Sequence, residues 1–145
     1  KRVGKNLTKF LIYSGNMIDA KNACDMGLID KVVSWDEIGG LFENPHELTS
    51  AKKGPSQNWI DVDNFIDGKT VKNLLEHSSK ASEWDWLLRK MVKKAPRALE
   101  IAEKLIDAER GPASELKYLK EIFTTDDALA GLQSVGKVPP KYQGH

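Results

Sequence analysis

The stretch that decides the fold is residues 84–108, which read WDWLLRKMVKKAPRALEIAEKLIDA. Its first half has apolar residues at the i, i+3, i+4, i+7 spacing of an amphipathic helix, namely Trp84, Leu87, Leu88 and Met91. Ala95-Pro96 ends this helix, and Pro96 suits the first position of the next one because proline cannot continue a helix. A second apolar stripe follows, formed by Ala98, Ile101, Ala102, Leu105 and Ala108. We therefore predict two consecutive helices and a mainly α fold, an orthogonal helical bundle.

Towards the C-terminus, two further helices are predicted. Gly111-Pro112 separates the first of them from the stretch above, and its apolar positions are Leu116, Leu119, Ile122 and Phe123. Thr125 is a suitable N-cap for the second, in which Asp126 and Asp127 fall in the first turn, where the helix dipole favours negative charge. Pro139-Pro140 predicts an extended tail.

Towards the N-terminus, residues 7–14 have helical spacing, and Gly15 is placed to end that helix. Asp19 is a candidate N-cap for a short helix that Gly27 closes. The β-branched run 28–33 (LIDKVV) predicts one short strand near 29–33. Ser34 and Asp36 then offer caps for another short helix, which Gly39-Gly40 is expected to interrupt.

The middle of the chain predicts a long loop and two more helical segments. Residues from about 43 to 57 are rich in Pro, Gly and Ser and have few apolar anchors, so we expect a loop that is the most mobile part of the molecule. Apolar residues return at 59–66, Asp67-Gly68 marks a turn, and a helix is predicted from Thr70 to His77.

The composition is that of a soluble globular protein. The chain has 145 residues, 40% of them apolar and 30% charged, with a formal net charge of +1. This balance argues against a nucleic-acid partner, and no apolar run is long enough to span a membrane. Cys24 is the single cysteine, which excludes an internal disulfide and favours a reducing, cytoplasmic location, with Cys24 as a buried small hydrophobe. Because the chain begins with Lys1 and shows no signal-peptide pattern, we expect a piece of a longer protein without a secretory leader.

Familiar catalytic and ligand motifs are missing. The sequence has no dinucleotide-binding glycine fingerprint and no phosphate loop, and we predict no metal and no cofactor. The three histidines, His46, His77 and His145, are too scattered along the chain to predict a metal site. The acidic run 61–64 fails as a calcium loop, since Ile66 and Lys72 stand where such a loop needs glycine and glutamate.

Two stretches carry a family resemblance. In the first, Ser14-Gly15-Asn16-Met17-Ile18-Asp19-Ala20 precedes Ala23 and the run Gly27-Leu28-Ile29-Asp30-Lys31-Val32-Val33. In the second, Ala95-Pro96-Arg97-Ala98 and Lys104 precede Phe123-Thr124-Thr125-Asp126-Asp127, Gly131, Lys137 and the close Pro140-Lys141-Tyr142-Gln143-Gly144. In this order they resemble the C-terminal part of the enoyl-CoA hydratase/isomerase (crotonase) superfamily, over residues 1–40 and 92–145. Gly136 and Val138 depart from the family pattern, and residues 43–90 match nothing in it.

The resemblance implies a single C-terminal module without the catalytic core. Residues 1–42 would form a helix-helix-strand segment, 43–82 an atypical insertion, and 83–145 the C-terminal oligomerisation helices. In the family, the spiral core that precedes this region holds the oxyanion hole and the proton-transferring carboxylates, so no residue here inherits a catalytic role. We expect a module that oligomerises as trimers and covers the acyl-CoA pocket of a lyase or isomerase of fatty-acid or related acyl-CoA metabolism, inactive in isolation.

Two residues inherit accessory roles from the resemblance. Phe123 matches a position at the acyl pocket and subunit boundary, and Lys137 matches a lysine that approaches a phosphate of coenzyme A (CoA), the substrate's carrier. Alternative roles are a core aromatic for Phe123 and a solvated surface lysine for Lys137. The parent protein could also be a bifunctional 3-hydroxyacyl-CoA dehydrogenase/enoyl-CoA hydratase. A further alternative comes from a different functional class, in which the chain is a helical protein-interaction module without an acyl-CoA role.

Overall fold

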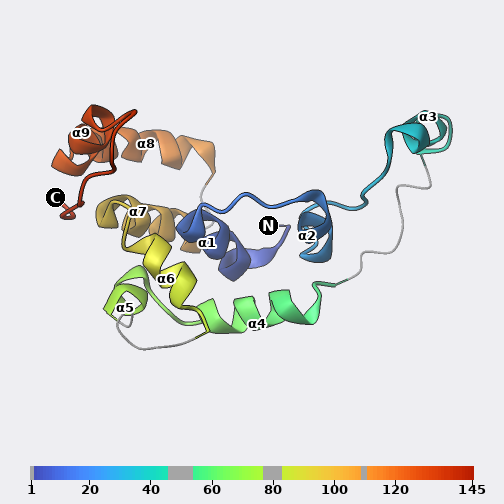
Figure 1. Cartoon of the computed structure of the whole chain (residues 1–145), viewed down its shortest axis with the longest axis horizontal. Coiled ribbons are helices and arrows are strands. Elements are labelled where there is room, and N and C mark those ends of the chain that lie inside the picture. The colour runs from blue at the N-terminus through green and yellow to red at the C-terminus, as the bar shows by residue number, and fades with distance from the viewer. Residues whose placement is uncertain (1, 46–53, 77–82, 109–110) are drawn as a thin grey trace. The chain divides into compact units, whose positions relative to one another are not determined.

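The computed structural model describes residues 2–45, 54–76, 83–108 and 111–145, and all regular secondary structure in these ranges is helical (Figure 1). The helices are α1 (Gly4–Ser14), α2 (Ala20–Asp25), α3 (Trp35–Glu43), α4 (Gln57–Ile66), α5 (Val71–Glu76), α6 (Asp85–Met91), α7 (Pro96–Asp107), α8 (Pro112–Phe123) and α9 (Asp126–Gln133). The prediction of a mainly α protein is therefore confirmed. The chain divides into two compact units.

Several helix boundaries predicted from capping and terminating residues are confirmed. Gly15 and Gly27 have positive φ angles of 58° and 81°, a conformation that glycine adopts without a Cβ penalty. The Asp19 carboxylate accepts the backbone N–H of Asn22 at 2.8 Å, and the Thr125 hydroxyl accepts that of Ala128 at 3.1 Å. Pro96 begins α7, as the sequence predicted.

The predicted strand near 29–33 is wrong. The backbone N–H groups of Leu28 and Ile29 donate to the carbonyl of Ala23 at 2.8 and 3.3 Å, so they close the end of α2 and are not available for a sheet ladder. Val32 is 48% exposed, and the described residues contain no second strand with which this segment could pair. A β-branched run forms a strand only where a neighbouring strand satisfies its backbone groups.

The predicted interruption at Gly39-Gly40 is also wrong, because α3 runs through both glycines to Glu43. Its start is well fixed, since the Glu37 carboxylate accepts both the backbone N–H and the hydroxyl of Ser34, at 2.7 and 3.0 Å. Two glycines lower helix stability by only about 2 kcal/mol relative to alanine. Of the predicted 43–57 loop, residues 46–53 lie outside the described residues, as do His46 and His77, so its mobility stays a prediction.

Unit 1 comprises Lys1–Leu7 and Asn16–Asp67 and contains the first turn of α1 together with α2, α3 and α4. Its small core consists of Leu7, Ala23, Met26, Val62 and Ile66. Two polar links join its helices. The backbone N–H of Ser56, at the start of α4, donates to the carbonyl of Asp25 at 3.0 Å, and Asn6 on α1 donates to Asp63 and Asp67 at 3.3 and 3.1 Å.

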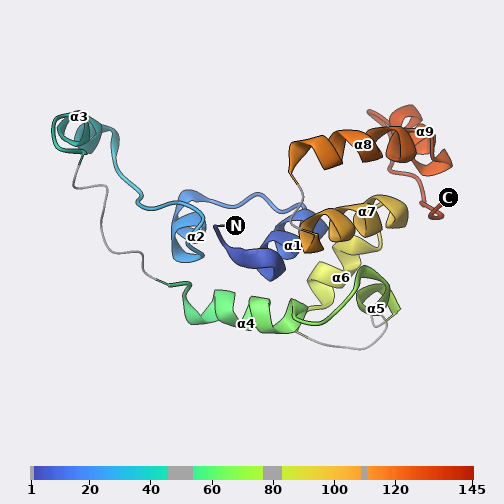
Figure 2. The same cartoon turned by 180° about the vertical axis from the view of Figure 1, so that it is seen from behind.

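Unit 2 comprises Thr8–Gly15 and Gly68–His145, and it contains the rest of α1 with α5 to α9. Helix α7 packs against α5 and α8, and α8 packs against α9. The succession of α7, α8 and α9 can be followed in both the front and the rear view (Figures 1 and 2). The core of unit 2 consists of Phe10, Tyr13, Val71, Leu74, Leu87, Leu88, Met91, Leu99 and Ile101. Phe10 and Trp86 meet edge to face, with ring centroids 5.7 Å apart.

Candidate functional site

Lys137 lies in the turn that follows α9. Its backbone N–H donates to the carbonyl of Ser134 at 2.8 Å, and the residue before it, Gly136, has a φ angle of 76°. The Lys137 side chain is exposed, and it forms no ion pair with any described residue. The lysine therefore presents an ammonium group to solvent from a tight turn.

Phe123 is the last residue of α8 and is 64% exposed, so it is not a core aromatic of this chain. It is one of several exposed apolar residues on α8, on α9 and in the turn that follows α9, a set that we call the C-terminal apolar surface. Its members are Leu116, Leu119, Phe123, Leu129, Leu132, Val135 and Val138, all at least 42% exposed. Exposed apolar residues gathered on neighbouring helices are typical of surfaces through which proteins associate.

Asp127 does more than the sequence predicted. Its side chain is buried, with 4% of the residue exposed, and its two carboxylate oxygens accept the backbone N–H groups of Gln143 and Gly144 at 2.7 and 2.8 Å. Its own backbone N–H donates to the carbonyl of His145 at 3.2 Å. The tail thus folds back onto the first turn of α9 (Figures 1 and 2).

Two glycines suit this tail, Gly131 by leaving space for a side chain and Gly144 by its backbone conformation. A Cβ atom at Gly131 would lie 3.2 Å from the hydroxyl oxygen of Tyr142, and one at Gly144 would lie 3.5 Å from the Cβ atom of Pro96. Gly144 also has a φ angle of 88°. Sequence reasoning did not find this arrangement, because Asp127 and Gly144 are 17 residues apart and no periodic pattern links them. The sequence features that could have indicated it are the spacing between Asp127 and Gly144 and the Pro-x-Tyr-x-Gly pattern of residues 140–144.

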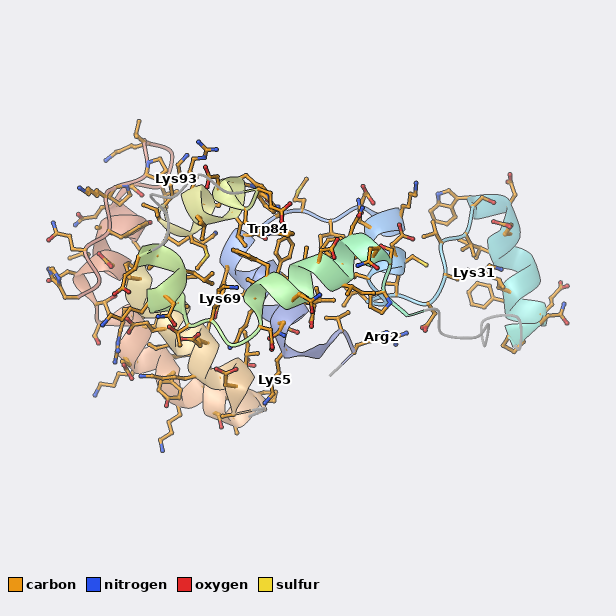
Figure 3. All side chains as sticks on the ribbon, turned by 90° about the horizontal axis from the view of Figure 1, so that it is seen from below. Arg2, Lys5, Lys31, Lys69, Trp84 and Lys93 are labelled. Atoms are coloured by element: carbon orange, nitrogen blue, oxygen red, sulfur yellow. The ribbon has the colours of Figure 1, made fainter. Side chains whose placement is uncertain are left out.

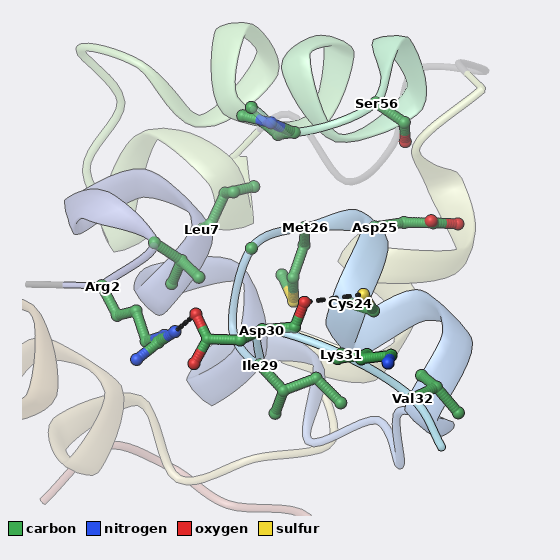
Figure 4. A pocket seen from close by; sticks show the side chains of 14 residues that line it. Arg2, Leu7, Cys24, Asp25, Met26, Ile29, Asp30, Lys31, Val32 and Ser56 are labelled. Atoms are coloured by element: carbon green, nitrogen blue, oxygen red, sulfur yellow. Dashed lines mark hydrogen bonds and ion pairs between the residues drawn. The ribbon is translucent and has the colours of Figure 1, made fainter. Parts of the chain in front are cut away.

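A cavity of about 780 Å³ lies in unit 1, lined mainly by residues of the α1 start, the α2 end and the segment that follows α2. On one side of it, Arg2 pairs with Asp30, whose backbone carbonyl oxygen lies 3.7 Å from the Sγ atom of Cys24 (Figure 4). Cys24 is half-buried, so its prediction as a buried residue is only partly right. Neither Lys137 nor Phe123 lines this cavity.

A buried ionic cluster holds α1, α5 and α7 together in unit 2. The Lys9 ammonium, with 9% of its side chain exposed, lies 2.7 Å from Asp107 and 3.8 Å from Glu103. Glu103 also accepts the backbone N–H of Val71 at 3.0 Å and the hydroxyl of Tyr13 at 3.4 Å. Desolvation of the Tyr13 phenol, together with the negative charges of Glu103 and Asp107, raises its pKa above the usual value. We infer a structural role for this cluster, because its groups bond to one another.

The raised pKa of Tyr13 predicts a loss of stability in alkali. The unfolded chain releases the phenolic proton near pH 10 and the folded chain keeps it, so the stabilisation is complete below pH 10 and declines above it. We expect Tyr13 to lower the free energy of unfolding by about 1.4 kcal/mol per pH unit in that range. Urea unfolding of the wild-type chain and of Tyr13→Phe at pH 8, 10 and 11 measures this contribution, since other ionising groups cancel in the difference. Equal pH slopes for the two chains would contradict it.

The described residues give little sign of other chemistry. They contain no group of three or more His, Cys, Asp or Glu side chains arranged to hold a metal ion. In the part of the chain that the structure describes, no helix has the length and apolar character needed to cross a membrane. Of the cations labelled in Figure 3, Arg2 and Lys5 come from the N-terminal segment, and Lys31, Lys69 and Lys93 come from three other segments.

Comparison of the chain with models of protein families, with curated proteins and with solved structures gives no match.

Proposed function

We propose that this chain is the C-terminal helical module of a crotonase-type enoyl-CoA hydratase/isomerase. It associates with further copies in a trimer-type assembly and covers the acyl-CoA pocket, while the catalytic groups belong to a preceding core. The ligand of the assembled enzyme is an acyl-CoA thioester. We also propose a cytoplasmic location, with which the single unpaired cysteine agrees.

The observation that supports this proposal best is the bond between Asp127 and the tail. The resemblance rests on residue types that recur in a fixed order, and the structure gives several of them a shared physical role. Thr125 caps α9, Asp127 binds the amides of Gln143 and Gly144, and Gly131 leaves space for Tyr142. Residues that depend on one another in this way are expected to occur together, which argues that their order in the sequence is not accidental.

The C-terminal apolar surface supports the self-association part of the proposal. Phe123 and Leu132 are 64% and 62% exposed on neighbouring helices, and a protein in water gains free energy by burying such residues against another surface. A helical interaction module without an acyl-CoA role would also use this surface. A measurement of CoA binding therefore distinguishes the crotonase-type module from the interaction module.

The test is the substitution Lys137→Ala in the full-length enzyme that the proposal implies. We expect the KM for a CoA ester to rise about tenfold at low salt with kcat unchanged, because a charge-assisted contact to a distal phosphate serves ground state and transition state equally. The increase should shrink at high salt, since charges at an exposed site are screened over about 8–10 Å at physiological ionic strength. Turnover of short pantetheine thioesters, which lack those phosphates, should not change.

The matched control is Lys141→Ala, which removes an exposed lysine from the same tail. Its KM should stay close to that of the wild type. If the full-length protein does not bind CoA esters at all, the acyl-CoA function is wrong and the interaction-module alternative stands. If binding occurs but Lys137→Ala behaves like Lys141→Ala, only the assignment of Lys137 is wrong.

A further inference from the structure

The turn that carries Lys137 is anchored on both sides. Before it, the Ser134 hydroxyl donates to the carbonyl of Gly131 at 2.7 Å, which fixes the end of α9. Within it, the backbone N–H of Lys137 donates to Ser134, and the positive φ angle of Gly136 permits the tight reversal. After it, the chain continues into the tail that Asp127 holds.

The anchor after the turn depends on Asp127. Each of the two carboxylate oxygens accepts a hydrogen bond from one of two consecutive backbone N–H groups, at 2.7 and 2.8 Å. Hydrogen bonds to a charged acceptor are roughly twice as strong as neutral ones. Because Asp127 is 4% exposed, water does not readily replace these partners. The neighbouring Asp126 is exposed and has neither bond, so of these two adjacent carboxylates only Asp127 binds the tail.

We propose that Asp127 is a positioning residue for anion binding at Lys137. By holding Gln143 and Gly144, it closes the segment from Ser134 to the tail into a fixed loop, which presents the lysine ammonium to a phosphate group of CoA. Asp127 itself does not touch the ligand. A loop that is fixed before binding loses less conformational entropy when the ligand arrives, so the effect falls on affinity. The inference rests on the proposed function for the identity of the ligand.

The experiment compares Asp127→Asn with Asp126→Asn in the full-length enzyme. We expect Asp127→Asn to raise the KM for a CoA ester about fivefold at low salt with kcat unchanged, and Asp126→Asn to leave both constants unchanged. The decisive measurement is the double variant. If Asp127 acts through Lys137, Asp127→Asn adds no further increase in KM in a Lys137→Ala background. If Asp127 had a purely structural role, Asp127→Asn would raise the KM by the same factor in the wild-type background and in the Lys137→Ala background.

A second variant and a ligand-free measurement guard against misfolding. Deleting residues 143–145 removes the partners of Asp127 and should reproduce the rise in KM. In the 145-residue chain, trypsin should cleave the Lys137–Val138 bond faster in Asp127→Asn than in the wild type or Asp126→Asn, with far-UV circular dichroism unchanged.

Three outcomes overturn the inference. They are equal KM values for Asp127→Asn and Asp126→Asn, additive effects in the double variant, and equal cleavage rates at Lys137. Absence of CoA-ester binding by the wild-type enzyme is a different result, because it removes the proposed function and this inference with it.

Discussion

Replacing Glu103 by alanine is expected to lower the free energy of unfolding by about 3 kcal/mol. The substitution removes the acceptor of the Val71 backbone N–H and of the Tyr13 hydroxyl, and it takes one of two carboxylates away from Lys9. Removing the partner of a buried charge lowers the free energy of unfolding by more than an exposed ion pair raises it. We place the value at the lower end of the usual range because Lys9 keeps Asp107, at 2.7 Å.

Glu100→Ala on the same helix is the control. Its carboxylate pairs with Arg97 at 3.0 Å, but 43% of its side chain is exposed, so its loss should cost less than about 1 kcal/mol. Glu103→Gln, which keeps an acceptor oxygen, should fall between the two. Urea unfolding followed by tryptophan fluorescence measures all three, since Trp86 contacts the core residue Phe10. Equal destabilisation by Glu103→Ala and Glu100→Ala would show that the cluster contributes no more than a surface pair.

The substitution Phe123→Asp is expected to weaken self-association of the chain about 100-fold. Phe123 is 64% exposed and belongs to the C-terminal apolar surface, and an aspartate placed there would have to lose its hydration in any assembly that buries this surface. Sedimentation velocity over a range of protein concentrations gives the dissociation constant for wild type and variant.

Phe42→Asp is the matched control, because Phe42 is an aromatic residue of α3 that is 84% exposed and belongs to unit 1. It should leave the dissociation constant of the chain unchanged. If Phe42→Asp abolishes association and Phe123→Asp does not, the copies meet through α3. A wild-type chain that stays monomeric at high concentration would refute self-association itself.

Local signals predicted the helices of this chain well, and long-range pairings escaped them. Asp19, Thr125 and Pro96 mark helix starts through bonds or dihedral preferences within a few residues, and such rules can be applied to sequence alone. The strand predicted at 29–33 was wrong because β-branched residues favour a strand, but a strand also needs a neighbouring strand with which to pair. Asp127 and Glu103 escaped for a related reason. Their partners lie far along the chain, and only the folded structure brings them together.

The candidate site could be predicted only as far as the resemblance reached. Lys137 and Phe123 come from matching positions in a family pattern, and the structure adds that both are exposed. Gly136 was noted only as a departure from the family pattern, although glycine is the usual residue where a turn needs the positive φ angle found there. The anchoring role of Asp127 required the distances to Gln143 and Gly144, which no residue pattern supplies.

The ionic cluster around Glu103 also bears on how the chain folds. Tyr13 and Glu103 are separated by 90 residues, and closing a loop of that length costs roughly 4 kcal/mol of chain entropy beyond a constant. Helices α5 to α9 can form their mutual contacts across much shorter loops. We therefore expect the N-terminal helix to dock late, after the contacts among α5 to α9 have formed. Until it docks, Lys9 and Tyr13 lack their partners on α7, and we expect such a partly assembled state to be prone to aggregation.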